Sequence, residues 1–343
     1  MSDDPLKVLA EKGQMVQEHL TQLLTIGTNA DFQEVVRWQV ECGGKRIRPA
    51  LTLLFAKAVG KKSEQDPSIL AAAAGIELIH NFSLIFDDII DQGNIRRGKK
   101  TTRAEFGDEM AILAGIQHRE SIYHAARATG SKYYPRVSQI FSESISQMAE
   151  GERLDILFEQ KKRSYDYFVT HQYNQVTEEE YLNMVWGKTG SLIRASCLLG
   201  TVVGDGTEEQ IQAAGEYGTT LGYAFQIMDD YLDLFADERL GKTIGKDILE
   251  RKLGNLVLIK ALQNLDEQKQ RALLDTIRGD LSDSERVTKA MNLINEGDGA
   301  RLAKESANIY ATKARKALEA SFPDSQTRQT LGSLADYVVS RLF

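Results

Sequence analysis

The sequence predicts an all-α protein, and three observations support this fold class. Apolar residues recur at three- and four-residue intervals, for example at Leu182, Val185 and Trp186, which is the spacing of one helix face. The alternation of apolar and polar residues that is typical of strands is scarce. Only five prolines occur in 343 residues, so few positions would interrupt a helix.

Local signals place several helix starts. Asp66 precedes Pro67 ahead of the apolar stretch that runs to Phe86, and proline is tolerated in the first turn of a helix. Three further starts have capping-box spacing, in which a Ser or Thr and a Glu or Gln three residues later bond to each other's backbone. These pairs are Thr177 with Glu180, Thr207 with Gln210 and Ser282 with Glu285. No low-complexity linker or shift in composition divides the chain, so we expect a single domain over residues 1–343.

Composition excludes several classes of protein. The net charge of −7 argues against a general nucleic-acid-binding surface, so any basic site must be local. Cys42 and Cys197 have no zinc-site spacing and favour a reducing, cytoplasmic location. There is no uncharged apolar run of about 18 residues, so we expect no membrane span. The acidic N-terminus lacks the apolar core of a secretion signal.

Two acidic clusters interrupt strongly apolar sequence, "DDIID" at 87–91 and "DDYLD" at 229–233. In a helix the first and last aspartates of each cluster lie one turn apart on one face. Three carboxylates on a half-buried turn repel each other unless a cation compensates them. Oxygen ligands without a nearby cysteine or paired histidine suit Mg²⁺, which completes its shell with water and substrate phosphate. A solvated acidic helix face is the alternative, but the repetition argues against it.

Five basic stretches accompany the acidic clusters. They are "GGKRIRP" at 43–49, "RRGKK" at 96–100, "GKTG" at 187–190, "GKTIGKD" at 241–247 and "ERKLGN" at 250–255. Each alone is typical of a solvated turn. Together with two metal clusters they indicate a site for highly anionic ligands, with diphosphate the natural candidate. The spacing of a P-loop and the GxSxG motif of a serine hydrolase are absent.

The motifs resemble those of the trans-isoprenyl diphosphate synthases, the all-α polyprenyl transferases. "GGKRIRP", "ELIHNFSLIFDDIIDQGNIRRGK", "EGERLD", "KTGSL", "GYAFQIMDDYLDL" and "GKTIGKDILERKLGN" stand in the family's order and cover roughly residues 40–260. The resemblance implies the isoprenoid synthase fold, a bundle of antiparallel helices around a central cavity. It also implies a homodimer. With the composition, it leaves the expectation of a cytoplasmic enzyme without a nucleic-acid partner or a membrane span.

The resemblance implies a role for particular residues. Three Mg²⁺ ions would be held by Asp87, Asp88, Asp91, Asp229, Asp230 and Asp233, which together with Lys188 form the catalytic set. The allylic diphosphate would be bound by Arg96, Lys188, Thr189, Gln226, Lys242 and Lys252, with Lys246 as the alternative to Lys242. Isopentenyl diphosphate would be bound by Lys45, Arg48, His80 and Arg97. Arg96 and Arg97 are thus expected to serve one substrate each, rather than to pair with the aspartates.

The reaction that the resemblance implies needs no nucleophilic side chain. Carbon–oxygen cleavage of the allylic substrate (dimethylallyl, geranyl or farnesyl diphosphate) gives a cation, the isopentenyl double bond attacks it, and a proton is lost. Two departures from the family pattern stand out. Phe86 replaces a histidine that many relatives have, and the stretch at 111–120 lacks an acidic residue that often follows its glycine. Neither removes a metal or diphosphate ligand.

Product length is expected to depend on the two residues that lie about 6–7.5 Å before Asp87 along its helix. Phe82 there would form a floor and Ser83 an opening. This pattern resembles the archaeal type of geranylgeranyl diphosphate synthase, which makes a C20 product, with farnesyl (C15) or C25 products as alternatives. Phe82 could instead be ordinary core.

Three other functions are compatible with parts of the sequence. A class I terpene cyclase would share the metal-driven ionisation but would not need the "GGKRIRP" segment or Arg97. A non-catalytic subunit of a synthase could tolerate broken aspartate clusters, yet both clusters are complete. A helical scaffold without chemistry would leave the acidic clusters without a purpose.

Overall fold

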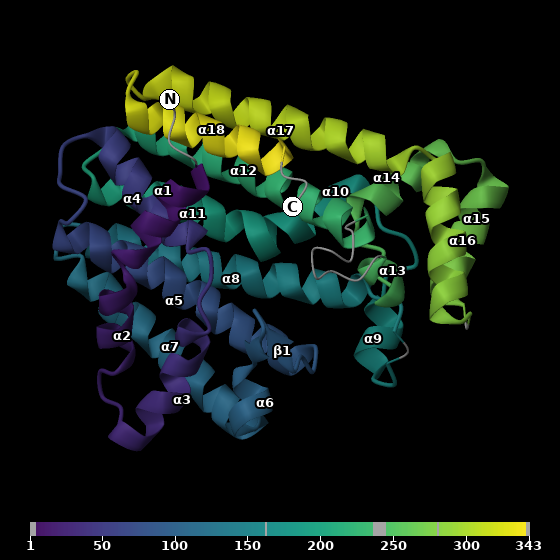
Figure 1. Ribbon diagram of the computed structural model, residues 1–343, viewed down its shortest axis with the longest axis horizontal. Coiled ribbons are helices and arrows are strands. Elements are labelled where there is room, and N and C mark those ends of the chain that lie inside the picture. The colour runs from purple at the N-terminus through teal and green to yellow at the C-terminus, as the bar shows by residue number, and fades with distance from the viewer. Residues whose placement is uncertain (1–4, 162, 236–244, 280, 341–343) are drawn as a thin grey trace. The chain divides into compact units, whose positions relative to one another are not determined.

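The computed structural model describes residues 5–161, 163–235, 245–279 and 281–340 (Figure 1). Helices make up nearly all of its regular structure, which confirms the all-α prediction. The exception among these residues is one small antiparallel hairpin of β1 (Ile95–Arg96) and β2 (Lys99–Lys100). Lys242, a predicted diphosphate ligand, lies outside the described residues.

The chain divides into two compact units, each assembled from separate segments. The first comprises the described parts of Met1–Ser146, Leu192–Gly218 and Lys316–Ser333. The second comprises those of Gln147–Ser191, Thr219–Arg315 and Leu334–Phe343. Five of the described helices contribute residues to both units: α8 (Tyr134–Phe158), α11 (Ser191–Val203), α12 (Glu208–Phe235), α17 (Gly299–Ser321) and α18 (Gln326–Ser340). The expectation of a single domain stays a prediction.

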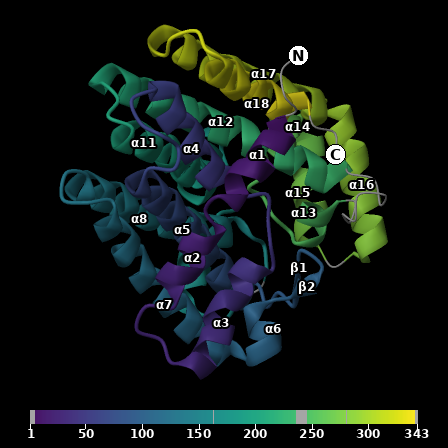
Figure 2. The same cartoon turned by 60° about the vertical axis from the view of Figure 1, so that its left-hand side comes forward.

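The first unit is organised around the apolar helix α5 (Pro67–Ile90). Its other helices are α1 (Pro5–Gln14), α2 (Gln17–Leu24), α3 (Ala30–Glu41), α4 (Ile47–Val59), α6 (Thr102–Phe106) and α7 (Asp108–Ala128), with most of α11 (Ser191–Val203). α5 packs against α7, α4 and α2 (Figures 1 and 2). It begins as predicted, because the Asp66 side chain accepts a hydrogen bond from the backbone of Ser68 and Pro67 occupies the first turn.

By length and composition α5 could cross a membrane, but 78% of its apolar window is buried inside the protein. That burial is typical of the core helix of a soluble protein. α5 positions functional residues in its second half, where His80 and the first acidic cluster follow one another along the helix.

The second unit holds the other helices. They are α9 (Asp166–His171), α10 (Glu178–Val185), a π-helical turn (Trp186–Gly190), α13 (Lys246–Leu249), α14 (Leu256–Asn264), α15 (Glu267–Arg278) and α16 (Asp283–Glu296). Its core includes Phe158, Tyr181 and Ile227, none of them measurably exposed. All three predicted capping boxes are present: Thr177 and Ser282 cap α10 and α16, and Thr207 exchanges hydrogen bonds with Gln210 at the start of α12.

Candidate active site

A pocket of about 400 Å³ in the first unit brings together all four residues expected to bind isopentenyl diphosphate, namely Lys45, Arg48, His80 and Arg97. Its lining also includes Cys42, Gly44, Arg46, Ile47 and Glu77. The residues that line it thus carry four permanent positive charges and one carboxylate. Such a surface attracts a multivalent anion.

The hairpin presents Arg97 to this pocket. Arg97 and Gly98 both have positive φ angles, 54° and 74°, as a tight two-residue hairpin turn requires. The Arg97 guanidinium donates to the carbonyl of Gly43 and lies so close to Gly44 that a Cβ there would be 2.6 Å from Nη1. A side chain at 44 would therefore displace the guanidinium from this position. The hairpin is held on α3, where Trp38 Nε1 donates to the Lys100 carbonyl at 2.9 Å.

His80 faces the same cluster of cations. Burial, reinforced by the positive charges of Arg48 and Arg97, holds the pKa of His80 well below its ordinary value of 6.5. The imidazole is therefore neutral at pH 7 and can donate one N–H to an anion. A bound diphosphate would offset these positive charges and so raise the pKa of His80 again.

Arg96 pairs with Asp88, and the expectation that it would avoid the aspartates is wrong. Its Nε and Nη2 lie 3.0 and 2.8 Å from Asp88 Oδ2 and Oδ1. Asp88 is only 4% exposed, so its carboxylate would be costly to bury without a cation. The chain reverses after α5, since the Gly93 N–H bonds to the Asp88 carbonyl, and this reversal returns Arg96 to the helix.

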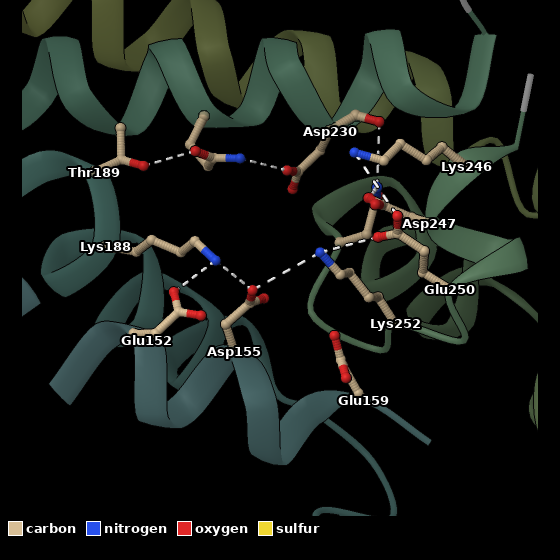
Figure 3. Close-up of polar contacts among 12 residues, drawn as sticks. Glu152, Asp155, Glu159, Lys188, Thr189, Asp230, Lys246, Asp247, Glu250 and Lys252 are labelled. Carbon is tan, nitrogen blue, oxygen red and sulfur yellow. Dashed lines mark hydrogen bonds and ion pairs between the residues drawn. The ribbon is translucent and has the colours of Figure 1, made fainter. Parts of the chain in front are cut away.

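The middle aspartate of the second cluster is likewise occupied by protein donors. Asp230, also 4% exposed, accepts from Gln226 Nε2 at 3.0 Å and from the backbone N–H of Leu256 at 3.1 Å. Gln226 Oε1 in turn accepts from Thr189 Oγ1 at 2.7 Å, so three predicted site residues form one chain of hydrogen bonds (Figure 3).

Asn255 links this chain to a second buried carboxylate, and sequence reasoning missed both residues. Asn255 Nδ2 donates to Asp247 Oδ2 at 2.7 Å and to the Asp230 carbonyl at 3.2 Å, while Asn255 Oδ1 caps α14. Burial raises the pKa of Asp247 to about 6, against the opposing charge of Lys252. The sequence motif "GKTIGKDILERKLGN" contains both residues and could have identified them as site residues.

Lys188 and Lys252 both contact Asp155 (Figure 3). Lys188 Nζ lies 2.6 Å from Asp155 Oδ2 and 2.8 Å from Glu152 Oε2, and Lys252 Nζ lies 3.8 Å from the same Asp155 oxygen. Burial opposes ionisation, but the two ammonium groups lower the pKa of Asp155 to about 2. Asp155 therefore stays ionised between the lysines.

Asp155 and Glu152 also escaped the sequence interpretation, although "EGERLD" was part of the resemblance. Their three-residue spacing places them on one helix face, which was the usable signal. Lys246, the alternative to Lys242, is half exposed and 3.8 Å from Glu250. The choice between Lys242 and Lys246 stays a prediction.

The remaining aspartates suit a hard metal ion. Asp87 on α5 and Asp91 at its C-cap, and Asp229 and Asp233 on α12, are partly or fully exposed, and the two aspartates of each pair lie one turn apart. Among the described residues, no three His, Cys, Asp or Glu side chains are grouped to hold a metal by themselves. Pairs of carboxylates that leave coordination positions to water and phosphate are the usual arrangement for Mg²⁺. The carboxylates of these two pairs therefore fit Mg²⁺.

Comparison with known proteins identifies the family of this chain. The family model for polyprenyl synthetases matches residues 29–294. A short chain isoprenyl diphosphate synthase of Methanothermobacter thermautotrophicus is 35% identical over 98% of both chains. The geranylgeranyl diphosphate synthase of Methanosarcina mazei is 32% identical over 95% of this chain and 94% of its own.

Solved structures agree with the sequence comparison. The crystal structure of geranylgeranyl pyrophosphate synthetase from Pyrococcus horikoshii superimposes with a TM-score of 0.86, at 33% identity and 98% coverage of both chains. The chain therefore belongs to the polyprenyl synthetase family, has the all-α isoprenoid synthase fold and is a trans-prenyltransferase.

Proposed function

We propose that this prenyltransferase condenses isopentenyl diphosphate with allylic diphosphates and releases geranylgeranyl diphosphate. The observation that carries the proposal is the basic pocket of the first unit, lined by Lys45, Arg48, His80 and Arg97. Relatives named for the same C20 product support the product length, and a farnesyl or C25 product is the alternative.

We assign the allylic diphosphate to the cations of the second unit. Lys188 and Lys252 supply positive charge, and the Thr189 hydroxyl and Gln226 amide supply hydrogen bonds. Lys242 is included from the sequence motif. These groups stabilise the negative charge that develops on the leaving diphosphate, so that carbon–oxygen cleavage is assisted without a nucleophilic side chain. The proton released after condensation passes to the departing diphosphate.

We assign the six aspartates of the two clusters to two different roles. We assign Mg²⁺ binding to Asp87, Asp91, Asp229 and Asp233, and three ions per site stay a prediction. When bound, Mg²⁺ neutralises the diphosphate and improves it as a leaving group. The structure favours another role for the two middle aspartates: Asp88 orients Arg96, and Asp230 orients Gln226. Arg96 stays assigned to the allylic diphosphate from the sequence motif.

Product length is assigned to the aromatic residues ahead of Asp87. The rings of Phe82 and Phe86 meet edge to face with centroids 5.1 Å apart. Ser83 is small, and its hydroxyl donates to the His80 carbonyl at 2.8 Å. One aromatic at position 82 beside a small residue at 83 corresponds to a C20 product in the family pattern.

The enzyme is proposed to work as a homodimer in the cytoplasm. Ile112, Leu113 and Ile116 form an apolar face on α7, and each is 41–51% exposed. A second copy of the chain would cover this face and remove the apolar area from water. The two buried cysteines, Cys42 and Cys197, are both free, as expected in a reducing compartment.

One assay tests the reaction against its rivals. The protein is incubated with Mg²⁺, isopentenyl diphosphate and each allylic diphosphate of five, ten or fifteen carbons, and the products are separated by chromatography. We expect linear elongation that ends at C20. A cyclic hydrocarbon would indicate a terpene cyclase. Absence of product with every primer would indicate a non-catalytic subunit and refute the proposal.

A further inference from the structure

Arg46 differs from its basic neighbours in the segment 43–49. It is 9% exposed and has a left-handed backbone, with φ 49° and ψ 37°, directly before α4. Arginine rarely adopts this conformation, which therefore has to be held by other contacts. Its guanidinium supplies them: Nη1 lies 2.5 Å from Glu77 Oε1, and Nη2 donates to the Val40 carbonyl at 2.6 Å.

Glu77 is the partner that ties this turn to α5. It is 2% exposed and also accepts from Asn81 Nδ2 at 3.2 Å. His80 follows three residues later, so Glu77 and His80 share one side of the helix. The Arg46–Glu77 ion pair thus joins the turn that carries Lys45, and that leads into α4 with Arg48, to the helix that carries His80.

Arg46 also meets the N-terminal helices. Its Nη2 lies 3.3 Å from Gln17 Oε1 on α2, and a Cβ at Gly13 on α1 would overlap the Cβ of Arg46. The side chain is therefore enclosed by α1, α2, the end of α3 and α5. An arginine in such surroundings is held in one orientation and cannot swing to meet a substrate.

The charge balance of the pocket gives this pair a functional consequence. Four cations and one carboxylate line the pocket, and the carboxylate is that of Glu77. With Arg46 committed to Glu77, Lys45, Arg48 and Arg97 supply the charge for a diphosphate. Without Arg46, Glu77 would be a buried acid that has lost its ion-pair partner and keeps the Asn81 amide, which costs stability and repels the ligand.

We propose that Arg46 is a positioning residue for isopentenyl diphosphate: its ion pair with Glu77 sets the turn that presents Lys45 and Arg48, and it neutralises the acid of the pocket. The inference rests on the proposed function, which assigns isopentenyl diphosphate to this pocket. Arg46 acts through its neighbours and is not a ligand of the substrate.

Steady-state kinetics with both substrates test the inference. We expect Arg46→Met to raise the KM for isopentenyl diphosphate by about thirtyfold or more, and to change the KM for the allylic diphosphate by less than about twofold. Arg46→Met combined with Glu77→Gln removes the uncompensated acid and should recover about fivefold of that loss. Calorimetric titration with isopentenyl diphosphate alone should show the same order of affinities without turnover.

Two further variants separate positioning from folding. Arg286→Met removes an arginine of the second unit that is 3% exposed and ion-paired to Asp283, so it should lower the melting temperature and leave the KM for isopentenyl diphosphate unchanged. If Arg46→Met does not fold, Arg46→Lys takes its place. Lysine keeps the positive charge but lacks the second nitrogen that contacts the Val40 carbonyl, so the KM for isopentenyl diphosphate should still rise about fivefold.

The inference is overturned if a folded Arg46 variant keeps the wild-type affinity for isopentenyl diphosphate. It is also overturned if both substrate KM values rise together, or if Glu77→Gln recovers nothing in the double variant. A wild-type protein that elongates no primer in the chromatographic assay refutes the proposed function instead, and calorimetric titration of that protein still decides whether Arg46 shapes a diphosphate site.

Discussion

Asp88 and Arg96 form a two-pronged ion pair, in which Nε and Nη2 of the arginine contact both carboxylate oxygens at 2.8–3.1 Å. This ion pair separates Asp88 from the other two aspartates of the acidic cluster. Asp88 is committed to the protein, whereas Asp87 and Asp91 are more open to solvent. The same division holds in the second cluster, where Asp230 is committed to Gln226 and Leu256.

The first prediction concerns metal dependence. Asp87→Ala and Asp229→Ala should each lower kcat by about a thousandfold or more, because a metal ligand is lost. Asp91→Asn should raise the Mg²⁺ concentration for half-maximal rate by about tenfold, whereas Asp88→Asn should change it by less than about threefold. Titration of activity against Mg²⁺ measures both. Equal shifts for Asp88 and Asp91 would contradict the division of roles.

The second prediction concerns the acid between two lysines. Asp155→Asn removes the charge that holds Lys188 and Lys252, so kcat/KM for the allylic diphosphate should fall by about tenfold. The KM for isopentenyl diphosphate should stay the same. Glu150→Gln is the matched control, because Glu150 lies on the same helix and pairs with Arg153 at the surface. An unchanged kcat/KM in Asp155→Asn would rule out this role.

The third prediction concerns stability and pH. His118 is fully buried, its Nε2 lies 2.8 Å from the Val36 carbonyl, and burial lowers its pKa from 6.5 to about 4. Below pH 6.5 the unfolded chain binds a proton that the folded chain refuses, so acid favours unfolding. Between pH 7 and 5 the wild type should lose about 2 kcal/mol of unfolding free energy more than His118→Gln.

Urea unfolding at a series of pH values measures this difference. His171→Gln provides the control, because that histidine is exposed on α9. An equal loss of unfolding free energy in His118→Gln and the wild type would show that another group is responsible.

The fourth prediction concerns product length. Phe82→Ala opens the floor ahead of Asp87 and should extend the products beyond C20. Ser83→Phe places a second aromatic ring there and should shorten them to C15, so the two variants move the distribution in opposite directions. Product chromatography with each primer decides. If neither variant shifts the distribution, other walls set the length and Phe82 is ordinary core.

The positions of helices could be predicted where the signal is local. Asp66 with Pro67, Thr177 with Glu180 and Ser282 with Glu285 begin helices as expected. Capping depends on groups two or three residues apart, which sequence spacing states directly. The aspartates of each cluster also follow helical geometry, so their relation within one turn was predictable.

The partners of the charged residues could not be predicted in the same way. Arg96 returns to Asp88 only because the chain reverses after α5, and Lys188 meets Asp155 across 33 residues of sequence. Spacing in the chain says nothing about such pairs, because many cations and acids of equal chemistry compete for each other. The packing of helices selects among them.

The amino-acid sequence by itself determined the helical class, the capped helix starts, the two acidic turns and the chemistry of the ligands they suit. Each follows from groups within one or two helical turns of each other. Only the tertiary structure decided which acids are buried and paired: Asp88 with Arg96, Asp155 with Lys188, and Glu77 with Arg46. A buried charge requires a partner, and folding determines which groups are buried together.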